Sequence, residues 1–316
     1  MFGHQDDPFY GISWQWEQGR SDVLETCGDH PAVMGFDIGG IETGAEVNLD
    51  SVPFTLLREE LLAHVQRGGI ATISWHPRNP LTGGTAWDVS DSTVVHSILP
   101  NGSHHKLFCQ WMEHVATFLL SLRDDNGHAL PVIFRPWHEN NGSWFWWGKD
   151  LCTPEEYRRL WNMLQDYLLS AGLKNLVWSY SPNVAGFTHE KFLERYPGDD
   201  RIDIIGLDAY QQQNAEADFI RLTNADLDVL CSYASTAQRL VALTECGFEN
   251  LPDSMWWTRV LLPIVERHEL SYCLVWRNAN AAHYFAPAPE TKDASDFREM
   301  LKSKNILMLK DVKIEY

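Results

Sequence analysis

Two glutamates, Glu139 and Glu245, each follow a short apolar run of the sequence, and together they could carry out acid–base and nucleophilic chemistry. Two carboxyl groups held about 5–5.5 Å apart can cleave a glycosidic bond with retention of configuration. One protonates the leaving oxygen, and the other attacks the anomeric carbon. Because a lone glutamate at the end of a strand is more often a structural ion-pair partner, the interpretation depends on elements that bring both side chains to one place.

The residues around the two glutamates favour different roles for them. Glu139 shortly precedes the aromatic run 144–147. An apolar setting raises the pKa of a carboxyl group, as a proton donor requires. A nucleophile must stay ionised, and Arg135 or Tyr210 could support the charge of Glu245. The flanks therefore predict Glu139 as the acid/base and Glu245 as the nucleophile.

Eight short apolar runs alternate with longer amphipathic stretches, as expected for parallel strands buried on both faces and helices between them. The first run ends near His4, and the others are at 32–37, 70–75, 131–135, 176–179, 202–207, 240–244 and 272–276. Helices are expected at 54–67, 107–122, 153–171, 188–195, 215–238, 253–269 and 293–304. Eight such units predict an α/β fold, a (β/α)8 TIM barrel that occupies residues 1–316 as a single domain. An open doubly wound sheet is the competing fold, but no G-x-G-x-x-G turn follows the first strand.

Polar and aromatic residues follow nearly every predicted strand, where barrels carry their active sites. In strand order they are His4 to Asp7, Asp37, His76 with Arg78, Arg135 with His138 to Asn141, Tyr180 with Asn183, Asp208 with Tyr210, Glu245, and Trp276 with Arg277. Strands four and seven lie on roughly opposite sides of an eight-stranded barrel. We therefore expect Glu139 and Glu245 to face one another across its mouth.

Composition excludes several classes of function. The formal net charge of −18 disfavours nucleic acid and anionic membranes as partners. No run of 18 apolar residues is present, so we expect no membrane span. The six cysteines form no C-x-x-C pair and the sequence has no H-E-x-x-H, so no metal and no cofactor are expected. The single histidines His76 and His138 fit packing and substrate binding equally well. The sequence does not decide whether any of the cysteines form disulfides.

Tryptophan is unusually abundant, with 14 residues. Flat apolar rings suit both the C–H faces of sugars and ordinary packing. Eight of the tryptophans stand beside polar residues in loop-like stretches: Trp14, Trp16, Trp75, Trp87, Trp144, Trp146, Trp147 and Trp276. Composition alone does not separate a sugar site from core packing for this set.

The stretch from Arg135 to Gly148, R-P-W-H-E-N-N-G-S-W-F-W-W-G, resembles the strand-four signature of glycoside hydrolase family 26, best known for β-mannanases. The family pattern is R-P-x-H-E-x-N-G-x-W-F-W-W-G, and the resemblance runs from Phe2 to Arg277. It implies a clan whose acid/base ends strand four and whose nucleophile ends strand seven. Trp137, Asn140 and Cys246 depart from the usual residues, which puts subsite shape in doubt but not the class of reaction.

Carried over position by position, the resemblance implies Glu139 as acid/base and Glu245 as nucleophile, with His138 positioning the nucleophile and the sugar. His76 would contact the sugar in the −1 subsite, and Trp144 would form a platform near the cleavage point. Asp208 and Tyr210 would lie near the −1 sugar. Trp276 would floor that site, and Arg277 would reach the −2 sugar.

The resemblance implies an endo-β-1,4-mannanase that retains configuration and acts on β-mannan poly- or oligosaccharides, including galactomannan and glucomannan. Mixed-linkage β-glucanase or β-1,3-xylanase activity is the alternative within the family. A sugar-binding barrel without catalysis and a metal-dependent hydrolase are alternatives of other classes. We expect a monomer in an extracellular, cell-surface or periplasmic location, and an export signal that precedes the present Met1.

Overall fold

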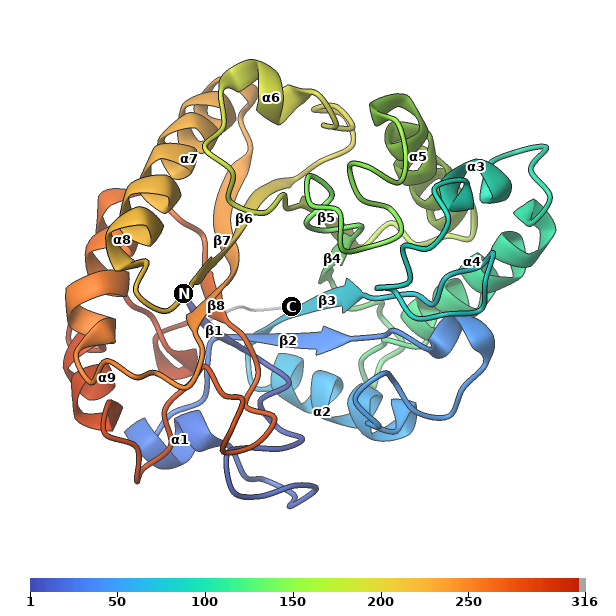
Figure 1. Cartoon of the computed structure of the whole chain (residues 1–316). Helices are drawn as coiled ribbons and strands as arrows, with labels where there is room; N and C mark the ends of the chain where they lie inside the picture. The colour runs from blue at the N-terminus through green and yellow to red at the C-terminus, as the bar shows by residue number, and fades with distance from the viewer. Residues whose placement is uncertain (313–316) are drawn as a thin grey trace.

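The computed structural model of the chain describes residues 1–312, and its parallel strands close into a barrel in the order β1 to β8. Figure 1 shows the helices arranged around the strands. Each strand pairs with the next one along the chain, and β1 pairs with β8. The strands are β1 Phe2–Gln5, β2 Val33–Asp37, β3 Ile70–Trp75, β4 Val132–Pro136, β5 Leu176–Tyr180, β6 Ile204–Gln211, β7 Leu240–Phe248 and β8 Cys273–Val275. The predicted (β/α)8 barrel is confirmed.

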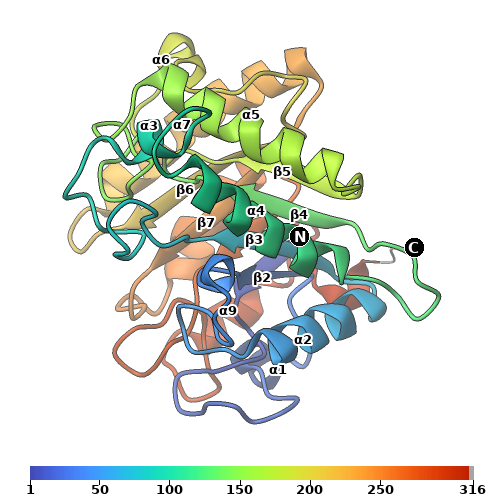
Figure 2. The same ribbon diagram turned by 90° about the vertical axis from the view of Figure 1, so that its right-hand side faces the viewer.

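The helices follow the predicted amphipathic stretches closely. They are α1 Asp22–Cys27, α2 Phe54–Gln66, α3 Val94–Ile98, α4 His105–Leu120, α5 Pro154–Ser170, α6 His189–Leu193, α7 Glu216–Ala237, α8 Leu262–Arg267 and α9 Ala294–Met300. In the side view of Figure 2, α5, α4 and α2 lie in succession along the outside of the barrel. The predicted start of α5 is confirmed, because Thr153 is the N-cap and forms a reciprocal capping box with Glu156 in the first turn, with Pro154 as the first helical residue. None of the helices within residues 1–312 is both long and apolar enough to cross a membrane.

The predicted helix at 253–269 is replaced by two shorter segments. Trp257–Leu261 is a π-helical turn that leads directly into α8. Pro263 lacks a backbone N–H and cannot continue the i to i−4 pattern, which accounts for the wider turn before it. Helices α1 and α3, of six and five residues, were too short to produce a detectable sequence period.

Strands β6 and β7 extend beyond the predicted ends at 207 and 244, so Asp208, Tyr210 and Glu245 lie within strands instead of after them. Their pairing continues to Gln211 and Phe248 across a register shift. The extension was not predicted because polar residues interrupt the apolar runs where the strands line the barrel mouth.

A continuous apolar core lies between the helices and the strands. A smaller apolar cluster fills the interior of the barrel near the start of the strands. Tyr272 and Leu274 belong to the smaller cluster, and both are almost fully buried. All six cysteines have free thiols, and three of them are buried, as expected for small core residues.

Candidate active site

A pocket of about 360 Å³ opens at the carboxyl-terminal ends of the strands. Its lining mixes carboxylates, histidines, amides and aromatic rings: His76, Trp87, His138, Glu139, Trp144, Phe145, Tyr210, Gln211, Gln212, Gln213, Glu245, Phe248, Glu249, Trp276, His283 and Phe285. Seven of the ten predicted site residues belong to this set. Arg135, Asp208 and Arg277 do not line the pocket.

Glu139 lies three residues beyond β4 on a backbone that only close packing can hold. Trp137 and Glu139 have φ angles of 54° and 52°, in the left-handed region that side chains disfavour. Trp137 is fully buried, with ring centroids 5.0 Å from Trp75 and 5.4 Å from Trp146. The Glu139 N–H donates to the carbonyl of Ser181 at 2.7 Å. The tryptophan packing thus fixes the direction in which Glu139 points.

The carboxyl group of Glu139 is set up to hold a proton. Its oxygens accept hydrogen bonds from Asn183 Nδ2 at 2.8 Å and from Trp144 Nε1 at 2.7 Å. Burial is the main effect that raises the pKa of Glu139 to about 7, and the nearby charge of Glu245 raises it further. At neutral pH, Glu139 therefore titrates in the range that a general acid/base needs.

Glu245 is aimed by an irregularity in β7. Leu207 pairs with Leu243, but the next residue of β6, Asp208, pairs with Glu245, so Thr244 is the extra residue on β7. Such bulges redirect side chains beside active sites. Gly206 makes room for this one, because a Cβ there would come within 2.5 Å of Thr244 Oγ1.

The carboxylate of Glu245 receives two strong hydrogen-bond donors. Arg135 Nη2 donates to Oε1, and the Tyr210 hydroxyl donates to Oε2 at 2.7 Å. Burial and the charge of Glu245 raise the pKa of Tyr210 well above its ordinary value, so the phenol keeps its proton. Arg135 and Tyr210, the two residues predicted to support the charge of Glu245, both contact its carboxylate. Charge-assisted hydrogen bonds of this kind hold a carboxylate in one orientation, as attack on the anomeric carbon requires.

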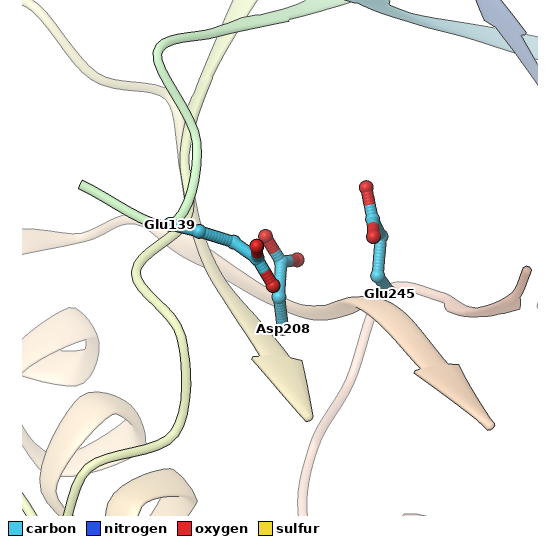
Figure 3. Close-up of side chains that lie close together, drawn as sticks. All are labelled: Glu139, Asp208 and Glu245. Atoms are coloured by element: carbon cyan, nitrogen blue, oxygen red, sulfur yellow. The ribbon is translucent and has the colours of Figure 1, made fainter. Parts of the chain in front are cut away.

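Figure 3 shows that Glu139, Asp208 and Glu245 converge from the β4–α5 segment, β6 and β7. One oxygen of each lies within 4.8 Å of the others, a spacing compatible with retaining hydrolysis. Three carboxylates this close could also hold a cation. However, the Arg135 guanidinium already lies among them, 3.1 Å from Asp208 Oδ2 and bonded to Glu245. The positive charge that the acidic group requires thus comes from a side chain.

Two histidines extend the network from β2 to the β4–α5 segment. Asp37 Oδ2 contacts His76 Nδ1 at 2.6 Å, and the Nε2 atoms of His76 and His138 are 3.0 Å apart. Burial alone would lower the pKa of His76, but the carboxylate of Asp37 outweighs it and raises that pKa. Burial and the charge of Arg135 lower the pKa of His138 well below its ordinary value. The raised pKa of His76 and the lowered pKa of His138 favour a charged His76 that donates a hydrogen bond to a neutral His138.

The tryptophans divide between packing and the pocket. Trp75, Trp146 and Trp147 are fully buried and belong to the core. Trp87, Trp144 and Trp276 line the pocket, and the first two are 48% and 41% exposed. Of these, Trp87 is stacked on His76, with an interplanar angle of 12°. Exposed rings in a polar pocket fit stacking on sugar faces.

Arg277 forms an ion pair with Asp50 Oδ1 at 3.1 Å, and its guanidinium lies 5.9 Å from the ring centroid of Tyr10. It is thus fixed between loops that follow β1 and β2, outside the pocket lining. Asp50 and Tyr10 were not selected from the sequence, because nothing near them in the chain distinguishes them from loop residues.

Three further residues of the site were visible in the sequence but not chosen. Asp37 and Asn183 were recognised at strand ends, and Trp87 was recognised among the tryptophans beside polar residues. Each has a direct contact with a predicted site residue: Asp37 with His76, Asn183 with Glu139, and Trp87 with His76. Their role depends on which loops meet, and a single chain does not reveal this.

Replacing Arg135 with Met is expected to destabilise the fold by about 3–5 kcal/mol at pH 7, because it leaves Asp208 and Glu245 buried without their cation. Burial already raises the pKa of Asp208 well above its ordinary value, and the nearby Arg135 charge opposes that rise, so the pKa would rise further in the variant. The loss therefore grows with rising pH and shrinks towards pH 5. Urea unfolding at both pH values measures it. The exposed Arg78→Met is the control, with an expected change within about 0.5 kcal/mol, and equal stability of the two variants would contradict the prediction.

A closed parallel barrel with buried carboxylates, one of them with a raised pKa, and exposed tryptophans around one mouth is typical of glycoside hydrolases. A profile of glycosyl hydrolase family 26 matches residues 1–253. The chain belongs to this family.

The chain is similar to several mannanases of this family. The structure of a GH26 β-mannanase from Bacteroides ovatus is 48% identical, with a TM-score of 0.97, over 100% of this chain and 93% of that one. A mannan endo-1,4-β-mannosidase of Bifidobacterium adolescentis is 36% identical over 259 residues, 78% of this chain and 25% of that protein. An endo-β-1,4-mannanase structure from Cellulomonas fimi has a TM-score of 0.89 at 30% identity, over 99% of this chain and 72% of that one. The chain thus spans about a quarter of the Bifidobacterium relative.

Proposed function

We propose that the protein is a retaining endo-β-1,4-mannanase, with residues 1–316 as one catalytic domain. The observation that carries the proposal is the pair formed by Glu139 and Glu245, whose oxygens approach within 4.8 Å in the pocket. Their environments differ as the two roles require, because Glu139 has a raised pKa and Glu245 has two strong donors. The similarity to GH26 β-mannanases over the full chain supports mannan as the substrate.

In the first step, Glu139 donates its proton to the leaving oxygen while Glu245 attacks the anomeric carbon and forms a covalent glycosyl-enzyme. The negative charge of Glu245 disappears in this bond. Because that charge helps to raise the pKa of Glu139, the pKa falls in the intermediate. Glu139 then accepts a proton from the attacking water, and the second step releases a product of unchanged configuration.

The remaining residues hold the sugar and the catalytic pair. Tyr210 and Arg135 hold the Glu245 carboxylate by hydrogen bonds, and Asp208 holds Arg135 through an ion pair. His76 and His138 line the pocket at the cleavage point, and the hydrogen bond between their Nε2 atoms fixes the two rings against the sugar. Trp276 and Trp144 provide apolar faces on either side, and Arg277, held by Asp50, contacts the next sugar towards the non-reducing end.

We expect kcat/KM to fall as the pH rises through about 7, with the midpoint of the decline at the pKa of Glu139. The acid must be protonated, and the pKa of Glu139 is about 7, so kcat/KM is full below that pH and declines above it. The measurement is a pH profile of kcat/KM on a mannooligosaccharide. A profile flat to pH 9 would remove Glu139 from the proton donor's role.

The substrate is tested by a time course of mannohexaose hydrolysis. Early release of mannobiose, mannotriose and mannotetraose together is the expected result for an endo-acting enzyme. Mannobiose alone from the start would point to action from the chain end. Intact mannohexaose beside a folded protein would reject mannan and direct the assay to mixed-linkage β-glucan and β-1,3-xylan.

We further propose that the protein is a monomer and acts outside the cell, at the cell surface or in a periplasm. Its polymeric substrate supports that location, because such polymers are met before import. Light scattering of the purified chain tests the monomer, and fractionation of the producing cells tests the location.

A further inference from the structure

A second pocket, of about 420 Å³, adjoins the catalytic one between the segment after β5 and helix α7. Trp144, Tyr210 and Gln212 line both pockets and form the boundary between them. The second pocket is therefore a continuation of the catalytic cleft and not an isolated surface depression.

The two residues that donate hydrogen bonds to Glu139 show which end of the cleft this is. Trp144 Nε1 and Asn183 Nδ2 donate to the two oxygens of Glu139, and both residues also line the second pocket. A general acid faces the leaving group, so the residues that hold it flank the leaving-group side. The second pocket therefore lies beyond Glu139 in the direction of the departing sugars.

The lining of the second pocket fits a pyranose ring. Val184, Phe219 and Leu222 supply apolar surface, and Asn183, Gln212 and Asp218 supply polar groups around it. Sugars present apolar C–H faces with hydroxyls at the edge, and ligand pockets combine apolar walls with a few polar groups in the same way. A charged or purely apolar ligand would match this lining less well.

The wall is held rigidly, as a binding site needs. Asp226 of α7 accepts backbone N–H bonds from Ala185 at 2.8 Å and Gly186 at 3.0 Å. Asn141 and the backbone of Asn183 are joined by two reciprocal hydrogen bonds of 2.7 and 2.8 Å. The segment after β5 is thus tied both to α7 and to the segment that carries Glu139.

We propose that this pocket binds the second sugar on the leaving-group side of the cleaved bond, and that Leu222 and Phe219 of α7 control how the chain is placed for cleavage. The proposal rests on hydrolysis of a β-linked glycan by the pair Glu139 and Glu245. Occupation of the pocket favours cleavage that leaves two or more sugars on the departing fragment.

The test is Leu222→Trp, which fills the pocket, with Ala217→Trp as the matched control on an exposed position of the same helix that does not line it. Mannopentaose labelled with ¹⁸O at its reducing end reports which bond is cleaved. In Leu222→Trp, the indole ring fills the space that the second sugar would occupy. We therefore expect kcat/KM to fall about tenfold for cleavage modes that release two or more sugars, roughly the loss of one sugar–pocket contact. Turnover of a 2,4-dinitrophenyl β-mannobioside, whose leaving group does not extend into the pocket, is expected to stay unchanged.

Several outcomes would overturn the proposal. One is an unchanged cleavage pattern in Leu222→Trp, and another is an equal loss on both substrates. A loss confined to 6-O-galactosylated mannopentaose would assign the pocket to a side-chain sugar instead. Leu222→Ala, which keeps the pocket open, guards against misfolding of the larger variant. If the wild type cleaves β-glucan oligosaccharides but not mannopentaose, the mannan proposal fails, and the same labelling experiment on cellopentaose still tests the pocket.

Discussion

Replacing Glu245 with Ala is expected to reduce turnover of mannooligosaccharides by more than about 10⁴-fold, because it removes the nucleophile and with it the covalent route. The fold should persist, since Arg135 keeps its ion pair with Asp208 and Tyr210 is partly exposed to solvent. Steady-state kinetics with melting temperatures measured in parallel would separate loss of chemistry from loss of structure. Wild-type-like turnover would remove Glu245 from the mechanism.

A small anion gives this prediction a stereochemical readout. In Glu245→Ala, azide can enter the space left by the carboxylate and attack the anomeric carbon of an activated β-mannoside directly. One displacement inverts configuration, so the product is an α-glycosyl azide. Glu249→Ala is the matched control, because Glu249 lines the same pocket but forms an exposed ion pair with His283. The control should retain most of its turnover without azide, and a β-azide from Glu245→Ala would contradict the assignment.

The barrel was predictable because its evidence is local. Each buried strand is a short apolar run. The start of helix α5 is marked in the sequence by the capping residues Thr153 and Glu156 and by Pro154. Glu139 was predictable for a similar reason, because it follows one such run and precedes a tryptophan-rich stretch. These features depend on neighbours in the chain, which a single sequence displays in full.

The orientation of the Glu245 side chain was harder to predict from the sequence, because it depends on a register shift between β6 and β7. Thr244 is an extra residue only relative to β6, and nothing in its own type indicates a bulge. The strand pattern alone stopped at Thr244 and put Glu245 beyond the strand, whereas pairing with β6 continues to Phe248. Register shifts are properties of two strands together.

The support of the site was hidden for the same physical reason. Asp37 contacts His76 across 39 positions of sequence, and Asn183 contacts Glu139 across 44. Closure of the barrel makes such pairs neighbours, and their identity follows from strand order and register. Residue type identified these side chains as polar groups at strand ends, but only the closed barrel shows which of them meet.

Replacing Glu139 with Ala is expected to lower kcat/KM on mannooligosaccharides by about 10²–10⁴-fold, the range for a positioned proton donor. The loss should nearly vanish in the first chemical step on a 2,4-dinitrophenyl β-mannobioside, because that leaving group departs without a proton. The alkaline decline near pH 7 should disappear with the carboxyl whose pKa sets it. Pre-steady-state release of dinitrophenol measures the first step directly.

Azide should distinguish this variant from Glu245→Ala by stereochemistry. With Glu245 intact, the glycosyl-enzyme forms first, and azide then attacks it in the space vacated by Glu139. Two displacements retain configuration, so a β-glycosyl azide is expected where Glu245→Ala gives the α-anomer. Asn183→Ala, which removes one donor to Glu139 but leaves the carboxyl in place, is the matched control and should give no azide product. An equal loss of activity on both substrates, or an α-azide, would show that Glu139 is not the acid/base.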